Sequence, residues 1–259
     1  MKHIVLALAT VLAALSPRAR ATWSIATINP RTGTIAVAGA SCSYMVYGIA
    51  SVVPGKGLVI VQAASNAKAR ADATAWLKAG KSLVSIMTRL TDPASEYEPA
   101  RQQYALLRLG DDTQPRVYTG NEVEGAKGTA TSDHVAVQAN TMVSHLVVKR
   151  TFAALDKTHW TSDEAMARDV MHAMNAGATA GGDKRCGRAN SASAFVGLYR
   201  KDDPERQPWM ELVVYGIEPG KASAMTRLDR LFDAWLKTGA HERSMRQFVV
   251  PRMNSDEPR

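Results

Sequence analysis

One short segment near the start of the chain, residues 22–28 (TWSIATI), carries apolar side chains on both faces of a predicted strand. Trp23 and Ile25 fall on one face, because successive strand side chains point to opposite sides of a sheet. Ala26 and Ile28 fall on the other face. A strand with one face in water alternates apolar and polar residues instead, so this pattern indicates a sheet covered on both sides.

The order of the predicted elements fits such a layered fold. The predicted strands cover residues 23–28, 34–39, 58–64, 103–109, 116–118, 134–138, 192–199 and 210–215. The predicted helices cover residues 67–79, 82–90, 142–155, 161–177 and 221–237, and the longest expected loop covers 121–133. A strand is the alternative within 142–155, because this segment contains three valines. Strands thus alternate with pairs of helices, without an internal repeat. We expect one α+β domain, a four-layer α-β-β-α sandwich with two stacked antiparallel sheets.

Composition narrows the function classes. The 259 residues are 46% hydrophobic and 22% charged, which is typical of a soluble globular chain. This composition excludes a chain that is mainly disordered and a bundle of membrane-spanning helices. Two cysteines are too few for a disulfide-dense scaffold or a four-cysteine zinc site. The six histidines show no HExxH-type spacing, and the glycine run at 177–182 lacks a following Lys-Ser/Thr pair. We therefore expect no metal, no other cofactor and no phosphate loop, and we interpret the glycine run as a helix end and turn.

Residues 1–21 have the pattern of a secretory signal peptide: a basic start, an apolar run at 4–15, a Ser-Pro break at 16–17 and an Ala-x-Ala site at 19–21. The apolar run is too short to span a bilayer, although an uncleaved membrane anchor stays as the alternative. Cleavage after Ala21 would remove three of the net +8 charges, and the mild excess that is left does not indicate a nucleic-acid partner.

These boundaries predict a signal peptide at 1–21, a single domain at 22–239 and a polar C-terminal tail at 240–259. The tail carries four of the arginines among polar residues, as a solvated end would. The mature protein is expected in the periplasm or outside the cell, without a membrane attachment. The sequence leaves open whether it forms a homo-oligomer.

Cleavage after Ala21 would make Thr22 the first residue of the mature chain. A threonine hydroxyl is a poor nucleophile, but a free α-amino group titrates near neutrality and can take the hydroxyl proton directly or through a water. One residue then supplies both nucleophile and base. Some residue must follow any signal peptide, so the position of Thr22 gains weight mainly from its place at the start of a predicted strand, where a rigid site can be built.

Nine short motifs follow one another along most of the predicted mature chain. They are Thr22-Trp23-Ser24-Ile25, Asn29-Pro30-x-Thr32-Gly33, Ala38-Gly39-Ala40-Ser41, Val61-Gln62-Ala63, Ser65-Asn66, Arg101-Gln102, Tyr118-Thr119-Gly120, Val137-Gln138-Ala139-Asn140 and Ala180-Gly181-Gly182-Asp183-x-Arg185. In this order they resemble the family known as domain of unknown function 1028. That family is similar in fold to N-terminal nucleophile (Ntn) hydrolases, so the resemblance implies the same four-layer sandwich. The family has no established activity, and the resemblance therefore bears on the fold more than on the function.

The chain departs from the family pattern in three places. Ala139 stands where the family has Gly, and Asn190-Ser191 stands where it has Gln-Ser. Near the last predicted strand of the domain, Val214-Tyr215-Gly216 replaces an Asp-Asp-His stretch of many members. If this acidic cluster binds a metal or a substrate in relatives, this chain lacks the residues for that role.

Polar residues at the ends of the predicted strands are the candidate partners of Thr22. Asn140 can offer side-chain and backbone N–H groups to a developing oxyanion, or it caps the helix that is expected to follow. Ser41, Gln62 and Asn66 could hydrogen-bond the Thr22 amine or a substrate, although such residues also satisfy turns and strand edges.

Two charged and two sulfur-bearing residues complete the candidate site. Asp183 and Arg185 follow a Gly-Gly pair and either bind substrate or form a structural ion pair. Cys42 and Cys186 lie beside the family motifs that contain Ser41 and Arg185. In an oxidising compartment we expect them to form a disulfide, and a reactive thiol at Cys42 is the alternative.

Two functions follow from these observations. The first is an exported Ntn-type hydrolase that cleaves a small-molecule or peptide amide, or a related acyl bond, through an acyl ester on Thr22 that water releases. The second is a non-catalytic sandwich of the same fold that acts as an envelope binding module, since the sequence shows no strong acid-base cluster.

Overall fold

The structure is a computed structural model that describes residues 21–110, 114–155, 160–238 and 243–249. The strands are β1 (Thr22–Ile28), β2 (Ile35–Ser41), β3 (Ala50–Val53), β4 (Gly57–Ala63), β5 (Gln102–Arg108), β6 (Arg116–Thr119), β7 (Ala126–Ser132), β8 (Val135–Met142), β9 (Ser193–Tyr199), β10 (Met210–Tyr215) and β11 (Ser244–Phe248). The helices are α1 (Ala67–Lys78), α2 (Leu83–Leu90), α3 (Leu146–Ala153), α4 (Asp163–Thr179) and α5 (Ala224–Thr238), and short 3-10 helices lie at Pro99–Arg101 and Lys184–Ala189.

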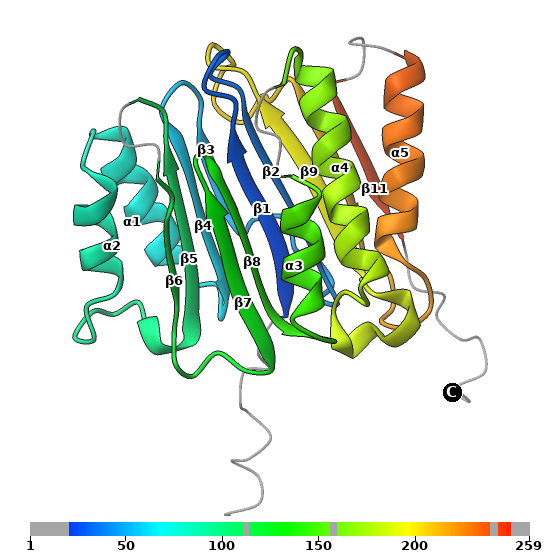
Figure 1. Cartoon of the computed structure of the whole chain (residues 1–259), viewed down its shortest axis with the longest axis horizontal. Coiled ribbons are helices and arrows are strands. Elements are labelled where there is room, and N and C mark those ends of the chain that lie inside the picture. Colours follow the sequence, from blue (N-terminus) through cyan, green and yellow to red (C-terminus); the bar gives the residue numbers. More distant parts are fainter. Residues whose placement is uncertain (1–20, 111–113, 156–159, 239–242, 250–259) are drawn as a thin grey trace, which may run out of the picture.

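These strands form two sheets, one of seven strands in the order β11-β10-β9-β2-β1-β8-β7 and one of four in the order β3-β4-β5-β6. Helices α1 and α2 lie on the outer side of the smaller sheet, and α3, α4 and α5 cover the outer face of the larger one (Figure 1). The fold is thus mixed α+β, with the two sheets between helices. The strand β1 contacts β4 and β5, so the larger sheet faces the smaller one at its centre.

Three apolar clusters hold these layers together. Between the sheets, Ala26 and Ile28 of β1 belong to one cluster with Leu58 and Ile60 of β4. A second cluster joins the larger sheet to α3, α4 and α5 and includes Trp23, and the third joins the smaller sheet to α1 and α2. Every residue of β1 is buried, which confirms that this segment is covered on both faces.

The close packing of α4 on β1 depends on Gly177. A Cβ at this position would lie 2.4 Å from Thr151 Oγ1 and 2.9 Å from Trp23 Nε1. Thr151 and the indole of Trp23 therefore occupy the space that a side chain at position 177 would need. The predicted helix end at Gly177 is wrong by two residues, because the helix continues to Thr179. The turn expected from the glycine run is made by Gly181 and Gly182, both with positive φ.

Three strands were not expected from the sequence. The short β3 follows the loop after Ser41, and β7 lies inside the segment 121–133 that was expected to be a loop. Both are edge strands of their sheets, and β7 consists of small and polar residues without an apolar alternation. The predicted helix at 142–155 is shorter, since Met142 ends β8 and α3 covers Leu146–Ala153.

The third unexpected strand lies in the segment 240–259 that was expected to be a solvated tail. Residues 244–248 form β11, which pairs with β10 in parallel, so the prediction of purely antiparallel sheets fails at this edge. Arg246 of β11 forms an ion pair with the buried Glu211 of β10. Residues 1–20, most of the predicted signal peptide, lie outside the described residues, as do 250–259.

A disulfide joins Cys42 and Cys186, as expected, and the structure therefore leaves no free thiol at Cys42. The bond connects the end of β2 to the 3-10 helix at Lys184–Ala189 across 144 residues of sequence. A disulfide is compatible with an exported protein. Within the described part of the chain, no helix has both the length and the apolar composition needed to cross a bilayer.

Candidate functional site

Thr22 is the first residue of β1 and is 2% exposed. It lies opposite Asn140 of β8 in the register of the two strands. Side chains two residues apart share a face, so Thr22 and Ser24 point toward the smaller sheet, on the same face as Ala26 and Ile28. This face of β1 therefore changes along the strand from polar at Thr22 to apolar at Ile28.

A chain of buried side-chain hydrogen bonds crosses between the sheets beside Thr22. Ser24 Oγ of β1 donates to Gln62 Oε1 of β4 at 2.6 Å. Gln62 Nε2 and Asn140 Nδ2 both donate to Gln103 Oε1 of β5, each at 2.9 Å. Gln103 Nε2 in turn donates to the backbone carbonyl of Ala139 at 3.1 Å. These bonds connect two residues of the larger sheet, Ser24 and Asn140, to two glutamines of the smaller sheet.

Asn140 keeps one atom that this network does not use. Its Oδ1 is buried and has no hydrogen-bond partner among the described residues. Asn140 was predicted to be an oxyanion donor or a helix cap, but it lies within β8 and caps none of the described helices. Because its Nδ2 already donates to Gln103, the unused atom is an acceptor, which suits an amine or a hydroxyl of Thr22 better than an oxyanion.

The residue before Thr22 is held by two donors. Ala21 is fully buried, and its carbonyl oxygen accepts a hydrogen bond from Ser41 Oγ at 2.5 Å. The same oxygen accepts a second bond from Arg185 Nη2 at 3.2 Å. Two residues that the sequence analysis nominated for the site therefore meet at the carbonyl of the Ala21–Thr22 peptide bond, although they are 144 positions apart.

Asp183 organises this side of the site. Its carboxylate is fully buried and forms an ion pair with Arg185 at 2.8 Å. It also accepts a hydrogen bond from the backbone N–H of Cys42 at 2.6 Å. The Cys42–Cys186 disulfide joins the same two chain segments that these contacts of Asp183 hold together. The ion pair, one of the two alternatives for Asp183 and Arg185, is thus present, and it orients the guanidinium toward Ala21. Whether these residues also bind substrate stays a prediction.

A hollow of about 10 Å³ opens beside Thr22. Its lining combines polar and apolar groups, namely Thr22, Ser43, Met45, Val46, Ile49, Gln62, Ala63 and Ser65. A volume of this size holds about one water molecule. The loop after β2 supplies most of the apolar part, and Met45 is 47% exposed at its outer end.

Asn66, the remaining nominated residue, has a structural role. It is the N-cap of α1, and its side chain accepts a hydrogen bond from the backbone N–H of Ala69 at 2.9 Å. Its own backbone N–H donates to Gln102 Oε1. The described residues contain no group of three His, Cys, Asp or Glu side chains close enough to hold a metal ion.

Sequence reasoning did not identify Gln103 or Ser24 as site residues. The sequence predicted Gln103 only as a strand residue, and yet its Oε1 accepts hydrogen bonds from both Gln62 and Asn140. A signal was present, because Gln62 and Gln138 each interrupt an apolar strand, as Gln103 does at the start of β5. A buried glutamine in such a strand must find a partner, and neighbouring strands with the same feature predict that the partners are one another.

Comparison with known proteins places the chain in a family. No protein with a curated description matches it. The crystal structure of protein SPO2555 from Silicibacter pomeroyi, described under DUF1028, is similar with a TM-score of 0.66 and 22% sequence identity, over 83% of this chain and 86% of that one. At this identity the similarity establishes the fold alone. The profile of a family of unknown function, DUF1028, matches residues 22–221, and its first matched residue is Thr22. The chain therefore belongs to the DUF1028 family.

Proposed function

We propose that this protein is an exported Ntn-type hydrolase that cleaves an amide or related acyl bond with Thr22 as its nucleophile. The observation that carries the proposal is the setting of the Ala21–Thr22 peptide bond. This bond lies at the start of a central strand, with Ser41 and Arg185 on the carbonyl of Ala21 and the unpartnered Oδ1 of Asn140 across from Thr22. The stacked sheets between helical layers support an Ntn-hydrolase-like fold.

Cleavage of this bond changes the chemistry of Thr22. The peptide N–H becomes an α-amino group, which can take the proton of the Thr22 hydroxyl. The Oδ1 of Asn140 is an acceptor suited to hold that amine. The guanidinium of Arg185 is paired with the carboxylate of Asp183, so the two groups together add little net charge beside the amine.

Cleavage also releases two hydrogen-bond donors. Ser41 Oγ and Arg185 Nη2 lose the Ala21 carbonyl as their acceptor, so both can bind a carbonyl oxygen of the substrate. In the reaction, the oxygen of Thr22 attacks the substrate carbonyl carbon and the amine takes the hydroxyl proton. The proton then passes to the leaving amine, and water hydrolyses the ester on Thr22. The substrate is a small-molecule or peptide amide.

The burial of Ala21 bears on the order of events. A signal peptidase needs an extended and accessible substrate, whereas Ala21 is fully buried in the folded chain. Cleavage by an external peptidase therefore precedes folding of the domain. The folded protein would then contain Thr22 as its first residue.

The second candidate function is an envelope binding module of the same fold. The size of the hollow beside Thr22 favours it, because about 10 Å³ admits a water molecule and no amide substrate. An active enzyme would need the Ser43–Ile49 loop to move outward, and the exposed Met45 lies in this loop.

The deciding experiment compares the mature protein with two variants at Thr22. Mass spectrometry first identifies the N-terminal residue of the exported protein, which should be Thr22 with a free amine. The mature protein is then incubated with pooled envelope amides and with an electrophilic probe that acylates N-terminal threonine. Thr22→Ala should abolish turnover and labelling at an unchanged melting temperature, and Thr22→Ser should retain both in part. Turnover that survives Thr22→Ala, or a mature chain that begins elsewhere, would reject the proposal.

A further inference from the structure

A second and much larger cavity lies on the other side of the Ser43–Ala50 segment. It has a volume of about 450 Å³ and is lined by residues of β2, β3, α1, β9, the β9–β10 loop and β11. Its lining joins β3, the edge strand of the smaller sheet, to the strands β2, β9 and β11 of the larger sheet. Met45, Val46 and Ile49 line the hollow beside Thr22, whereas Tyr47 and Ala50 line this cavity. The segment therefore separates two distinct sites.

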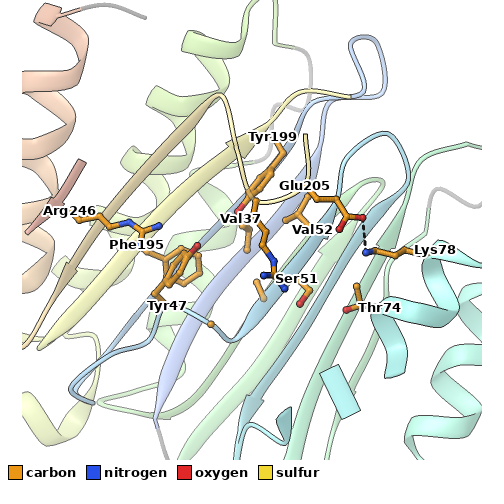
Figure 2. A pocket seen from close by; sticks show the side chains of 13 residues that line it. Val37, Tyr47, Ser51, Val52, Thr74, Lys78, Phe195, Tyr199, Glu205 and Arg246 are labelled. Atoms are coloured by element: carbon orange, nitrogen blue, oxygen red, sulfur yellow. Dashed lines mark ion pairs between the residues drawn. The ribbon is translucent and has the colours of Figure 1, made fainter. Parts of the chain in front are cut away.

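One wall of the cavity is aromatic. The rings of Tyr47 and Phe195 pack edge to face, with centroids 5.6 Å apart and an interplanar angle of 85°. Figure 2 shows these two rings together, with Tyr199 and Val37 beside them. The hydroxyl of Tyr47 donates to Glu211 at 2.6 Å, which fixes the ring in place. Rings held in this way form a rigid apolar surface for the flat or branched part of a ligand.

Three donor groups in the lining have no protein partner. The hydroxyls of Ser51 and Tyr199 and the guanidinium of Arg206 make no hydrogen bond or ion pair within the described part of the chain. Burial raises the pKa of Tyr199, so its hydroxyl stays protonated and can donate. These donors come from β3, β9 and the β9–β10 loop, and all of them border the same space.

The other cations of the lining are already paired. Lys78 and Glu205 form an ion pair at 2.6 Å on the side of the cavity next to α1, as Figure 2 shows. Arg246 is paired with the buried Glu211. Arg206 interacts electrostatically with Glu205, but that carboxylate is already paired with Lys78. Arg206 is therefore the one lining cation that forms no ion pair among the described residues, and it leaves the cavity with an excess of one positive charge.

The backbone at Arg206 also indicates a specific arrangement. Its φ is 62°, in the left-handed region that residues other than glycine rarely adopt. A glycine would remove this strain, and yet an arginine is present. Strained backbone positions of this kind are concentrated at ligand-binding sites, where the surrounding structure maintains them for function.

We propose that this cavity is a binding site for a small organic carboxylate with an aromatic or branched apolar body. The carboxylate would pair with Arg206 and accept hydrogen bonds from Ser51 and Tyr199, and the body would lie against Tyr47 and Phe195. A guanidinium and a carboxylate match in charge and planar shape. The volume lies within the usual range of about 300–1,000 Å³ for small-molecule sites. The site does not depend on catalysis by Thr22.

Titration calorimetry of the full mature protein with phenylacetate tests this assignment. Phenylacetate should bind at one site, and phenylacetamide, which has the same shape without the charge, should bind at least tenfold more weakly. Arg206→Gln should weaken phenylacetate at least tenfold, and Tyr199→Phe should weaken it severalfold. Inorganic phosphate at the same concentration should neither bind nor compete.

Two controls separate a local effect from misfolding. Arg206→Gly removes the side chain and relieves the left-handed strain, so it should fold and still lose binding. Arg230→Gln changes an exposed arginine on α5 and should bind phenylacetate as the unchanged protein does. Equal binding of the acid and the amide, binding that persists in both Arg206 variants, or preferential binding of phosphate would each overturn the proposal. Thr22→Ala should bind normally, so the result is independent of the proposed hydrolase activity.

Discussion

Asn140 on the larger sheet donates a hydrogen bond to Gln103 on the smaller sheet at 2.9 Å, next to the strand position of Thr22. This bond makes Gln103 the common acceptor of a polar layer in an otherwise apolar interface between the sheets. Buried amides are stable only when their donors and acceptors are paired. The candidate nucleophile therefore starts a strand that neighbouring amides hold in position.

Replacing Gln103 with Leu should destabilise the fold. The substitution keeps a similar volume but leaves the Nδ2 of Asn140 and the Nε2 of Gln62 without their acceptor. We expect the free energy of unfolding to fall by about 2–6 kcal/mol, at about 1–3 kcal/mol for each of the two buried groups left unpaired. Urea unfolding followed by circular dichroism measures this loss. Gln207→Leu, at an exposed position, is the control and should change stability by less than about 0.5 kcal/mol. An equally small change at Gln103 would contradict the role of the network.

A Gly177→Ala variant should be less stable, although alanine is the better helix former by about 1 kcal/mol. The new methyl group would overlap Thr151 Oγ1 and crowd the indole of Trp23. Overpacking of this kind costs about 1–3 kcal/mol. Thermal unfolding should show a lower midpoint than that of the unchanged protein. Gly128→Ala is the matched control, because its methyl group would meet only Val148 at an ordinary 3.7 Å. Stabilisation by Gly177→Ala would show that α4 does not pack on Trp23 as described.

Loss of the Cys42–Cys186 disulfide should lower stability by about 3–5 kcal/mol, since the bond closes a long loop. The double variant Cys42→Ala, Cys186→Ala should unfold at a lower urea concentration, and so should the reduced protein. Thiol titration of denatured protein gives an independent check. It should find no free thiol before reduction and two afterwards, and two thiols before reduction would show that the bond does not form.

His134 should make stability depend on pH. Burial lowers its pKa from the ordinary value of 6.5, against a smaller opposing effect of Asp133. The unfolded chain therefore binds this proton more readily than the folded one does. The contribution of neutral His134 to the free energy of unfolding is fully present above pH 6.5 and is lost as the pH falls toward the folded-state pKa. A tenfold difference in proton affinity corresponds to about 1.4 kcal/mol.

The test compares urea midpoints at pH 7.5 and 5.5. His134→Asn should show a smaller loss at low pH than the unchanged protein, and asparagine tolerates the positive φ of 63° at this position. His172→Asn, at an exposed position on α4, should retain the full loss. An identical pH dependence in the His134 variant would exclude this histidine as its source.

Periodicity was sufficient for the elements that are buried on at least one regular face. The apolar stripes of α2 and α5 and the apolar runs of β1, β4 and β9 were predicted with approximately their observed bounds. In contrast, β3, β7 and β11 are edge strands. Each pairs with a neighbour on one side only, and most of its side chains are not fully buried. Their sequences need not alternate, so no pattern distinguishes them from a loop.

The sequence predicted which residues belong to the candidate site better than it predicted what each of them does. Motifs identified Thr22, Ser41, Gln62, Asn140, Asp183 and Arg185, and the structure brings them near the start of β1. Their partners depend on which strands face each other, which no local pattern encodes. Gln103 was missed for this reason, and Asn66 was nominated although its side chain caps α1.

The sequence by itself determined the apolar faces that must be covered and the two cysteines available for one bond, and it predicted the segment whose removal would expose Thr22. Tertiary structure alone decided that Gln103 accepts from both Gln62 and Asn140, that Ser41 and Arg185 meet at Ala21, and that Arg206 borders a cavity in which it forms no ion pair. The physical reason is distance along the chain. The apolar patterns that predict helices, strands and their buried faces extend over a few neighbouring residues. The hydrogen bonds and charge pairs of the site join groups that only the packing of the two sheets brings together.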